Sequence, residues 1–450
     1  MNNLLAIEWS TIGVKAAQFI LSFSILIVLH EFGHYITAKW FGCRVEKFYL
    51  FFNPWFSLWK KKKGETEYGL GWIPLGGYVK ISGMIDESMD KEAMKLPAQP
   101  YEFRSKPAWQ RLIIMLGGII VNIILAIFIF IMITWTWGDK YIPNANLKYG
   151  IFADTLATKI GLKDGDRIIA VGGDTIEKAG TVGSEIVMRE AKSITINRNG
   201  ESMEIQIPDW FVSQMNSNRF GGFSYMRFPL IVDTVLKDAK ISSGIILKGD
   251  KLIGCNNIPV EYNMDIVRKF DGYKDTTASF LLLRNGTDTV KAEVYFDKKS
   301  NSFIGYQSPD KIFGTEHVQY SFFEAIPTGF NKCWSTLAKY MTGLRQLFTG
   351  KAKPSESVGS VLSIGGIYPG FWDWQIFWTL TAVFSIILAF MNILPIPGLD
   401  GGHSLFTLVE MITGRKPSDK FLEYAQMVGM VLLLALMAYA LGLDIWRIFK

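Results

Sequence analysis

The stretch FSILIVLHEFGHYITAKW, residues 23–40, places two histidines and one glutamate at the end of an apolar run. Ionisable side chains inside a membrane segment are costly and usually serve a function. His30 and His34 are four residues apart, so on a helix both imidazoles lie on one face and can bind one metal ion. Glu31 projects about 100° away, beside the open position of such an ion, where its carboxylate can take a proton from water. The spacing predicts a metal site with Glu31 as the catalytic base.

The composition indicates membrane helices joined to soluble domains. Of the 450 residues, 49% are hydrophobic and 20% are charged, which is more apolar than an ordinary soluble enzyme. The net charge of +6 includes the lysine run 60–63. Beside membrane helices such a run fixes topology or contacts anionic lipid, so we expect the lipid bilayer as a partner and no nucleic acid. Three widely separated cysteines predict neither a disulfide framework nor a thiolate metal site.

Apolar length predicts four membrane spans. They cover roughly residues 17–39, 112–137, 374–394 and 427–443. The first run has no small-residue cleavage site after it, so we expect a span and not a signal peptide. Basic residues between the first two spans predict that this segment faces the cytoplasm. Both termini and the long 138–373 segment are then expected outside. Basic residues after the third span agree with this orientation, whereas Arg447 and Lys450 disagree.

The 138–373 segment contains a weak internal repeat. IGLKDGDRIIAVGGDTI begins at Ile160, and SGIILKGDKLIGCNNIPV begins at Ser243. In both copies a Gly-Asp turn precedes an apolar strand, and Cys255 takes the place of Val171 as a core residue. This turn-strand signature resembles that of PDZ domains. We therefore expect two PDZ-like α+β domains, at residues 148–210 and 228–297. Residues 210–228 are expected to link them.

The segment 317–352 follows the repeats and predicts an amphipathic helix. Its apolar residues from Trp334 to Phe348 recur at three- and four-residue steps. We expect this helix to pack against the modules or against lipid headgroups.

A catalytic zinc ion usually has three protein ligands, so a third ligand must lie in another span. The third span ends in MNILPIPGLDGGH, residues 391–403. Running inward from outside, it reaches the cytoplasmic half of the bilayer at Asp400, the same level as His30. The prolines stop the helix, and Gly398, Gly401 and Gly402 are expected to permit a tight non-helical path. Asp400 is the predicted third ligand, and His403 is the alternative.

HExxH in the first span together with NILPIPGLDGG in a later one is similar to the site-2 protease family of intramembrane zinc metalloproteases. The four-span layout with two PDZ-like modules resembles its bacterial RseP-like branch. The resemblance implies Zn²⁺ held by His30, His34 and Asp400, with Glu31 as base. It also implies a bacterial inner-membrane location and cleavage of single-span membrane proteins, such as pre-trimmed anti-sigma factors or remnant signal peptides.

One segment and two asparagines are further candidates for binding the substrate. YGLGWIPLGGYVKIS, residues 68–82, predicts a β-hairpin at the cytoplasmic membrane face. Its residues Gly76, Gly77, Tyr78 and Val79 match the membrane-re-entrant β-loop of the related proteases, and its edge can add to an unwound substrate strand. A plain cytoplasmic hairpin is the alternative. The side chains of Asn392 and Asn122 can bind the substrate backbone; helix capping and helix packing are the respective alternatives.

The two modules are expected to gate access to the site, either by excluding large outer domains or by binding a new C-terminus in a groove near Ile160–Leu162. Two other classes of protein are weaker explanations. A soluble zinc protease on a membrane anchor would carry its third ligand outside the membrane segments. A noncatalytic PDZ scaffold would leave Glu31 without a role. The predicted architecture is thus a multi-pass α-helical membrane protein, with residues 1–137 and 374–450 carrying the two halves of the site.

Overall fold

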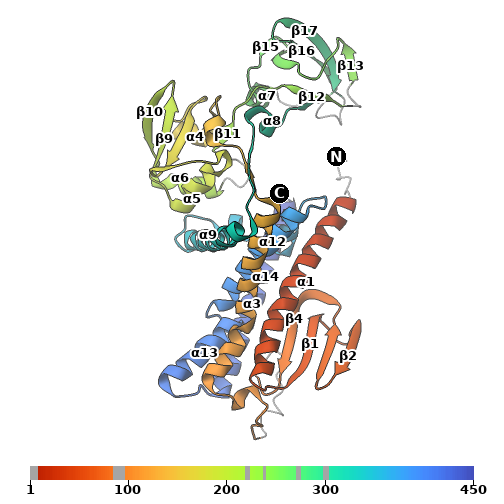
Figure 1. The fold of residues 1–450 in the computed structure, drawn as a ribbon, viewed down its shortest axis with the longest axis vertical. Coiled ribbons are helices and arrows are strands. Elements are labelled where there is room, and N and C mark those ends of the chain that lie inside the picture. Colours follow the sequence, from red (N-terminus) through yellow and green to blue (C-terminus); the bar gives the residue numbers. More distant parts are fainter. Residues whose placement is uncertain are drawn as a thin grey trace. The chain divides into compact units, whose positions relative to one another are not determined.

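The computed structural model describes residues 9–84, 97–217, 223–236, 240–269, 275–296 and 304–449. The chain divides into two compact units. The first comprises Met1–Gly138, Gln319–Thr342 and Ser357–Lys450, and the second comprises Asp139–Val318 and Gly343–Glu356. Long helices and one sheet make up the first unit, whereas most strands belong to the second (Figure 1).

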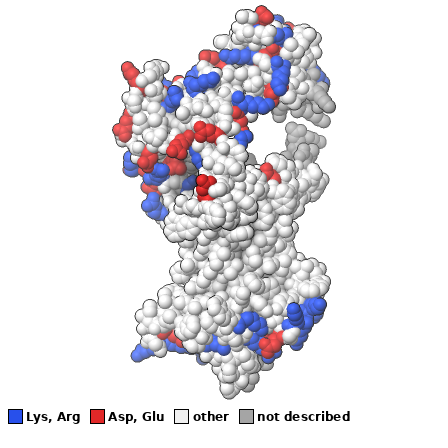
Figure 2. Space-filling view, in the orientation of Figure 1, with Lys and Arg blue, Asp and Glu red and all other residues white. Residues whose placement is uncertain are grey.

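Four helices in the described part of the chain are long and apolar enough to cross a membrane. They are α1 (Trp9–Trp40), α3 (Ala108–Trp137), α12 (Trp374–Ile393) and α14 (Asp419–Phe449). These four candidate spans fit the prediction of a multi-pass α-helical membrane protein. Figure 2 shows that these helices present a face without charged side chains, while lysine and arginine gather at the end of this unit that carries the sheet.

Helix α3 packs between α1 and α12 because small residues let the backbones approach. A Cβ on Gly33 would lie 2.3 Å from the carbonyl oxygen of Gly117, so α1 and α3 meet backbone to backbone. Buried hydroxyls add hydrogen bonds between helices: Ser22 Oγ lies 2.9 Å from Thr381 Oγ1, and Ser385 Oγ donates to the Asn122 carbonyl at 2.7 Å. These contacts fix the relative depth of the helices that carry the candidate site.

The sheet of the first unit has the order β2-β3-β1-β4. Its strands are β1 (Val45–Phe52), β2 (Trp59–Lys63), β3 (Thr66–Leu70) and β4 (Ile73–Ile81). The expected hairpin over 68–82 is wrong, because β3 and β4 both pair with β1, which lies between them. The link crosses the end of β1 at Gly71, where a Cβ would lie 2.3 Å from the Phe52 carbonyl oxygen. The lysine run lies in β2 and is exposed.

The other elements of the first unit connect or cover the spans. They are η1 (Phe103–Ser105), α9 (Phe322–Phe348, which continues into the second unit), α11 (Val361–Ile367) and α13 (Asp400–Thr413). The short helix α10 (Pro354–Ser357) belongs to the second unit except for its last residue. Most of the segment expected as an amphipathic helix forms α9: Ala325 and Cys333 are buried, whereas Phe323 and Trp334 are 80% and 65% exposed. A Cβ on Gly329 would lie 2.6 Å from the backbone of Ile131, so α9 packs directly on α3.

The second unit contains two α+β modules, each with its own hydrophobic core. The first comprises β6 (Ile151–Ala153), α4 (Thr155–Lys159), β7 (Arg167–Val171), β8 (Asp174–Thr175), η3 (Ala179–Thr181), α5 (Val182–Arg189), β9 (Ser193–Arg198), β10 (Glu201–Gln206), α6 (Asp209–Ser217) and β11 (Ser224–Met226). The second comprises β12 (Val232–Val235), β13 (Lys240–Ser243), β14 (Lys251–Cys255), β15 (Ile258–Pro259), α7 (Asn263–Lys269), β16 (Thr276–Arg284), β17 (Asp288–Phe296) and β18 (Ile304–Tyr306). Flanking them are β5 (Asp139–Tyr141), η2 (Asn144–Asn146), α8 (Pro309–Phe313) and β19 (Glu316–Val318), of which β5 and β19 pair with each other.

The internal repeat is structural. Asp166 and Asp250, the aspartates of the two Gly-Asp turns, are both 1% exposed. Arg198 donates two hydrogen bonds to Asp166, and Arg284 donates two to Asp250. Cys255 is buried at the end of β14, as Val171 is at the end of β7, so the prediction of a core cysteine is confirmed. The second copy differs from the first in having strand β13 where the first has helix α4.

The structure extends both modules beyond their expected boundaries of 148–210 and 228–297. The segment expected as a linker contains α6 and β11, whose Phe211 and Phe223 lie in the first core. Strand β11 pairs with β6 and closes that module; residues 218–222 of the expected linker are outside the described residues. In the second module β18 pairs with β12, so this module continues past 297. Pairing between distant strands sets these boundaries, and local sequence patterns do not reveal such pairing.

Candidate active site

The motif HEFGH lies in the last part of α1, where the histidines face α3. His30 and His34 are 8% and 6% exposed. Nδ1 of His34 lies 2.9 Å from the carbonyl oxygen of Ile114, which can only accept a hydrogen bond. Nδ1 therefore carries the proton, and Nε2 of His34 keeps its lone pair free for a metal ion.

Three ligand atoms converge at the end of this helix. Nε2 of His30 lies 3.3 Å from Nε2 of His34, and Asp400 Oδ2 lies 3.1 and 3.2 Å from the two nitrogens. A tetrahedral zinc ion with bonds of about 2.0–2.1 Å requires its ligand atoms to be about 3.3 Å apart. Asp400 Oδ2 is buried and accepts no hydrogen bond from the described residues, as suits an oxygen that faces a metal ion. The three residues thus fit a metal ion with one open position.

Asp400 reaches this position because the chain turns sharply between α12 and α13. The turn spans residues 394–399, and Gly398 has φ +95°. Gly401 and Gly402 were expected to form a non-helical path, which is wrong, because both lie in the first turn of α13. Because they have no side chains, these glycines let the start of α13 approach the preceding turn: a Cβ on Gly401 would lie 2.2 Å from the Leu394 carbonyl oxygen. Helix α13 thereby starts against the turn, with Asp400 as its first residue.

Asn122 of α3 contacts the ligand His30. Its amide nitrogen lies 3.1 Å from Nδ1 of His30, and its Oδ1 is buried without a hydrogen-bond partner among the described residues. An amide can present either end. With its oxygen toward His30, Asn122 accepts a hydrogen bond from Nδ1–H, and the lone pair on Nε2 of His30 then faces the ligand cluster, as in His34. The side chain is therefore placed to orient the His30 ring, in addition to its place between packed helices.

Two other candidates from the sequence lie near the three ligand atoms. Asn392 points its amide nitrogen to within 3.3 Å of His30 Nε2. No cap on α12 by the Asn392 side chain is seen in the described residues, where the backbone N–H of Leu394 donates to the carbonyl oxygen of Met391. His403 lies one turn after Asp400 and lines the same cavity. Among the described residues it does not belong to the group whose ligand atoms converge.

A cavity of about 630 Å³ opens at the metal-binding residues. Strand β4 lines one part of it through Gly77, Tyr78 and Val79, whereas Gly76 lies against the Phe52 ring. In the described sheet β4 pairs with β1 alone, so its other edge is open. Glu31 lines the cavity beside β4, and a Cβ on Gly77 would lie 3.5 Å from its Cγ. A carboxylate, a metal-binding cluster and an open strand edge thus share one cavity, which is the arrangement that peptide hydrolysis needs.

The comparison with protein families decides the identity. The model of Peptidase family M50 matches residues 18–436, which include every residue of the site. The chain belongs to peptidase family M50. The predicted membership in the site-2 protease family and the predicted peptidase activity are confirmed.

This M50 peptidase is similar over nearly its whole length to bacterial relatives. It is 26% identical to the regulator of sigma-E protease RseP of Escherichia coli, over 96% of this chain and 98% of the relative. It is 24% identical to a Ralstonia nicotianae protein, covering 96% and 98%, and 25% identical to one from Treponema pallidum, covering 90% and 93%. The names of the last two contain the words zinc metalloprotease. Four apolar helices and bacterial relatives fit a multi-pass protein of a bacterial inner membrane.

Sequence reasoning missed several residues of this M50 site. Lys47, Phe52 and Asn53 belong to β1 or the residue after it, and they line the cavity. The run VEKFYLFF, rich in aromatic residues, was the signal for this strand. Gln426 on α14 also lines the cavity; the signal was a polar amide inside an apolar span.

Proposed function

We propose that this chain is an intramembrane zinc metalloprotease that hydrolyses peptide bonds within transmembrane segments of single-span membrane proteins. Pre-trimmed anti-sigma factors and remnant signal peptides are the proposed substrate classes. The observation that carries this proposal is that the ligands come from α1, a membrane-spanning helix, and from the first residue of α13, directly after the span α12. A soluble protease on an anchor would have its ligands outside such segments.

The expectation of Zn²⁺ is confirmed by the comparisons, since relatives matched over nearly the whole chain are named zinc metalloproteases. We assign His30, His34 and Asp400 as the ligands. When bound, zinc polarises a carbonyl group and lowers the pKa of water, which makes amide hydrolysis possible at neutral pH.

The residues of this chain supply the other parts of the reaction. Glu31 takes the proton of the attacking water and passes it to the leaving amine. A transmembrane helix hides its carbonyl groups in its own hydrogen bonds, so the substrate must unwind before attack. The open edge of β4 can pair with the unwound segment and hold it extended beside Glu31. Asn392, next to the ligands, is our candidate for binding the reacting carbonyl oxygen.

The lysine and arginine residues at the sheet end of the first unit support an active site toward the cytoplasmic side. In this orientation the two modules and both termini lie in the periplasm.

We further propose that the tandem modules gate substrate access. Support comes from connectivity: the modules are inserted between α3 and α12, which carry Asn122 and Asn392 of the site. Two folded domains tethered at these points would exclude a substrate with a large outer domain by volume alone.

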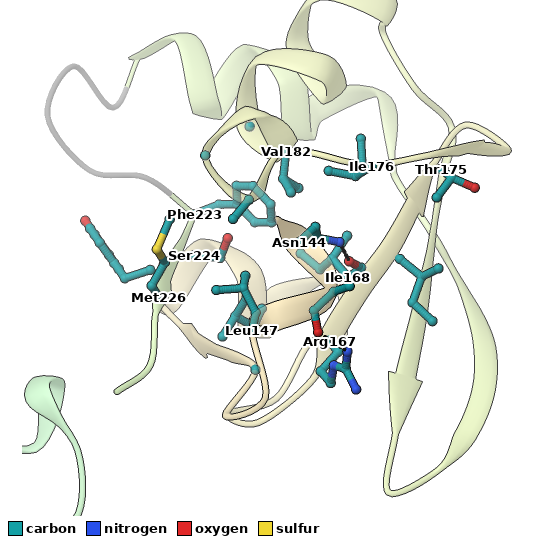
Figure 3. A pocket seen from close by; sticks show the side chains of 18 of the residues that line it. Asn144, Leu147, Arg167, Ile168, Thr175, Ile176, Val182, Phe223, Ser224 and Met226 are labelled. Carbon is teal, nitrogen blue, oxygen red and sulfur yellow. Dashed lines mark hydrogen bonds between the residues drawn. The ribbon is translucent and has the colours of Figure 1, made fainter. Parts of the chain in front are cut away.

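A peptide groove is the alternative means of gating. The groove was expected near Ile160–Leu162, but Leu162 is 1% exposed and belongs to the first core. The hollow of this module, about 520 Å³, lies elsewhere, between β11 and the start of α5 (Figure 3). Phe223, Ser224 and Val182 line it.

The experiment that tests the proposed function is substrate trapping. A Glu31→Gln variant keeps the ligands but loses the base, so it should retain membrane proteins that the wild-type enzyme cleaves. Mass spectrometry of the trapped proteins should identify single-span substrates. Recovery of soluble proteins alone would overturn intramembrane cleavage.

A further inference from the structure

Gln426, on the fourth span, is a polar side chain with no role in the mechanism above. It is 9% exposed and lines the cavity that holds His30, Glu31 and Asp400. Within the described part of the chain its amide makes no hydrogen bond or ion pair. The amide atoms are not sealed within the protein but are accessible from the cavity, so they can hydrogen-bond a molecule that enters it.

The position of Gln426 is fixed by the packing of α14. Gly429, one turn further along, lies against the turn that precedes Asp400: a Cβ on Gly429 would lie 1.5 Å from the Pro397 carbonyl oxygen. A Cβ on Gly398 would in turn lie 3.4 Å from the backbone nitrogen of Met430. Contact of two backbones at this point holds Gln426 at a fixed place relative to the metal ligand.

The chemistry of the cavity indicates what the amide binds. When a substrate strand pairs with β4, backbone groups on one edge of the substrate form hydrogen bonds. The N–H and C=O groups on the other edge of the substrate remain without partners. A glutamine side chain has one acceptor and two donor hydrogens, so it can bind the C=O and N–H of one peptide unit at the same time. Such recognition is independent of the substrate side chains. Leucine or methionine at this position would fill similar space and bind neither group.

From these observations we infer that Gln426 is a substrate-positioning residue, which hydrogen-bonds the backbone of the extended substrate on the edge that β4 leaves free. This inference rests on the proposed function, because it requires a peptide chain in the cavity. It assigns the fourth span a direct contact with the substrate.

The test compares Gln426→Leu with wild-type enzyme on a purified single-span substrate in detergent or vesicles. Loss of one or two neutral hydrogen bonds should raise KM about tenfold and leave kcat and zinc content nearly unchanged. A Gln18→Leu variant is the matched control. Gln18 is a buried amide that donates to the carbonyl oxygens of Pro369 and Phe371 at 2.9 and 3.3 Å, so its loss should lower thermal stability and not KM.

A scan of the substrate backbone separates positioning from a structural role. Substrates are made with one ester in place of an amide, which deletes a single N–H, at successive positions around the cleaved bond. At one position the ester should weaken binding to wild-type enzyme. In Gln426→Leu, which already lacks the hydrogen bond, the ester and amide substrates should bind equally at that position. If the ester effects are the same in both enzymes at every position, or KM is unchanged in the variant, the inference is wrong. Failure of wild-type enzyme itself to cleave, with Glu31→Gln indistinguishable from it, would instead contradict the proposed function.

Discussion

Gly118 of α3 lies directly against His34: a Cβ at Gly118 would lie 2.5 Å from Nε2 of that histidine and 2.6 Å from Cε1 of His30. No side chain larger than hydrogen fits between the backbone of α3 and the two imidazoles. The GG pair in the second span therefore borders the proposed metal ligands, and it explains why α3 packs so closely on the HExxH helix.

We predict that Gly118→Ala weakens zinc binding because the added methyl group displaces both imidazoles. Loss of ligand orientation by neighbouring substitutions typically costs about 10–100-fold in metal affinity. Metal content after dialysis against a graded chelator measures the effect. Gly13→Ala on α1 is the control, since a Cβ there meets nothing within 4 Å. Equal zinc retention in the two variants would contradict this account of the site.

The ligand assignment predicts different outcomes for three residues of the cavity. Asp400→Ala should lose zinc and activity together, whereas His403→Ala should keep zinc. Glu31→Gln should keep zinc and lose turnover by about 10²–10⁴-fold, as expected for a general base. Zinc content and cleavage rate are measured on the same preparations. If Asp400→Ala retains zinc while His403→Ala loses it, the third ligand is His403.

Strand β4 is predicted to hold the unwound substrate through its open edge. Neighbouring N–H groups in a strand point to opposite edges, so proline at Val79 and at Lys80 removes one N–H on each edge. One variant should disturb the pairing with β1, seen as a lower thermal midpoint. The other should keep the midpoint and lose cleavage, more for a stable substrate helix than for one with helix-breaking residues. Loss of the same size for both substrates would count against a strand clamp.

The gate is tested by replacing residues 140–310 with a flexible bridge. Exclusion by volume predicts that the truncated, zinc-loaded enzyme cleaves a substrate with its outer domain intact, which full-length enzyme leaves uncut. A bulky Gly183→Phe, which would fill the hollow of the first module, should then have little effect. A peptide groove predicts the reverse: Gly183→Phe abolishes cleavage of the trimmed substrate. Rejection of the untrimmed substrate by the folded, truncated enzyme would rule out a size gate.

Acid should loosen the second module. Hydrogen bonds from Arg284 hold the pKa of the Asp250 carboxyl below its ordinary value. Because the folded-state pKa is lowered, the stabilisation is present above the unfolded pKa of about 3.9 and is lost as the pH falls through the folded value. Hydrogen exchange of β14 and β16 in the full-length protein should therefore accelerate only below about pH 4.

Asp250→Asn should remove this acid dependence and cost about 2 kcal/mol of local stability at neutral pH, as for a lost hydrogen bond to a charged group. An unchanged acid profile in Asp250→Asn would place the responsible carboxylate elsewhere in the module.

The sequence by itself determined the four spans, the metal ligands as candidates and the internal repeat. These features depend on local rules: apolar length, an i, i+4 spacing on a helix, and a turn that precedes a buried strand. HExxH alone puts two imidazoles on one face, and the prolines before Asp400 end a helix wherever they occur. The same rules found α9 by its period, and they identified Cys255 as a core residue.

Only the tertiary structure decided which strands are neighbours and which distant side chains meet. The insertion of β1 between β3 and β4, and the closure of the first module by β11, depend on pairing between separated segments. The contacts of Asn122 with His30 and of Gln426 with the cavity depend on how helices pack. Backbone pairing and helix packing are long-range choices, made by shape and hydrogen-bond satisfaction across the whole fold, so no local pattern records them.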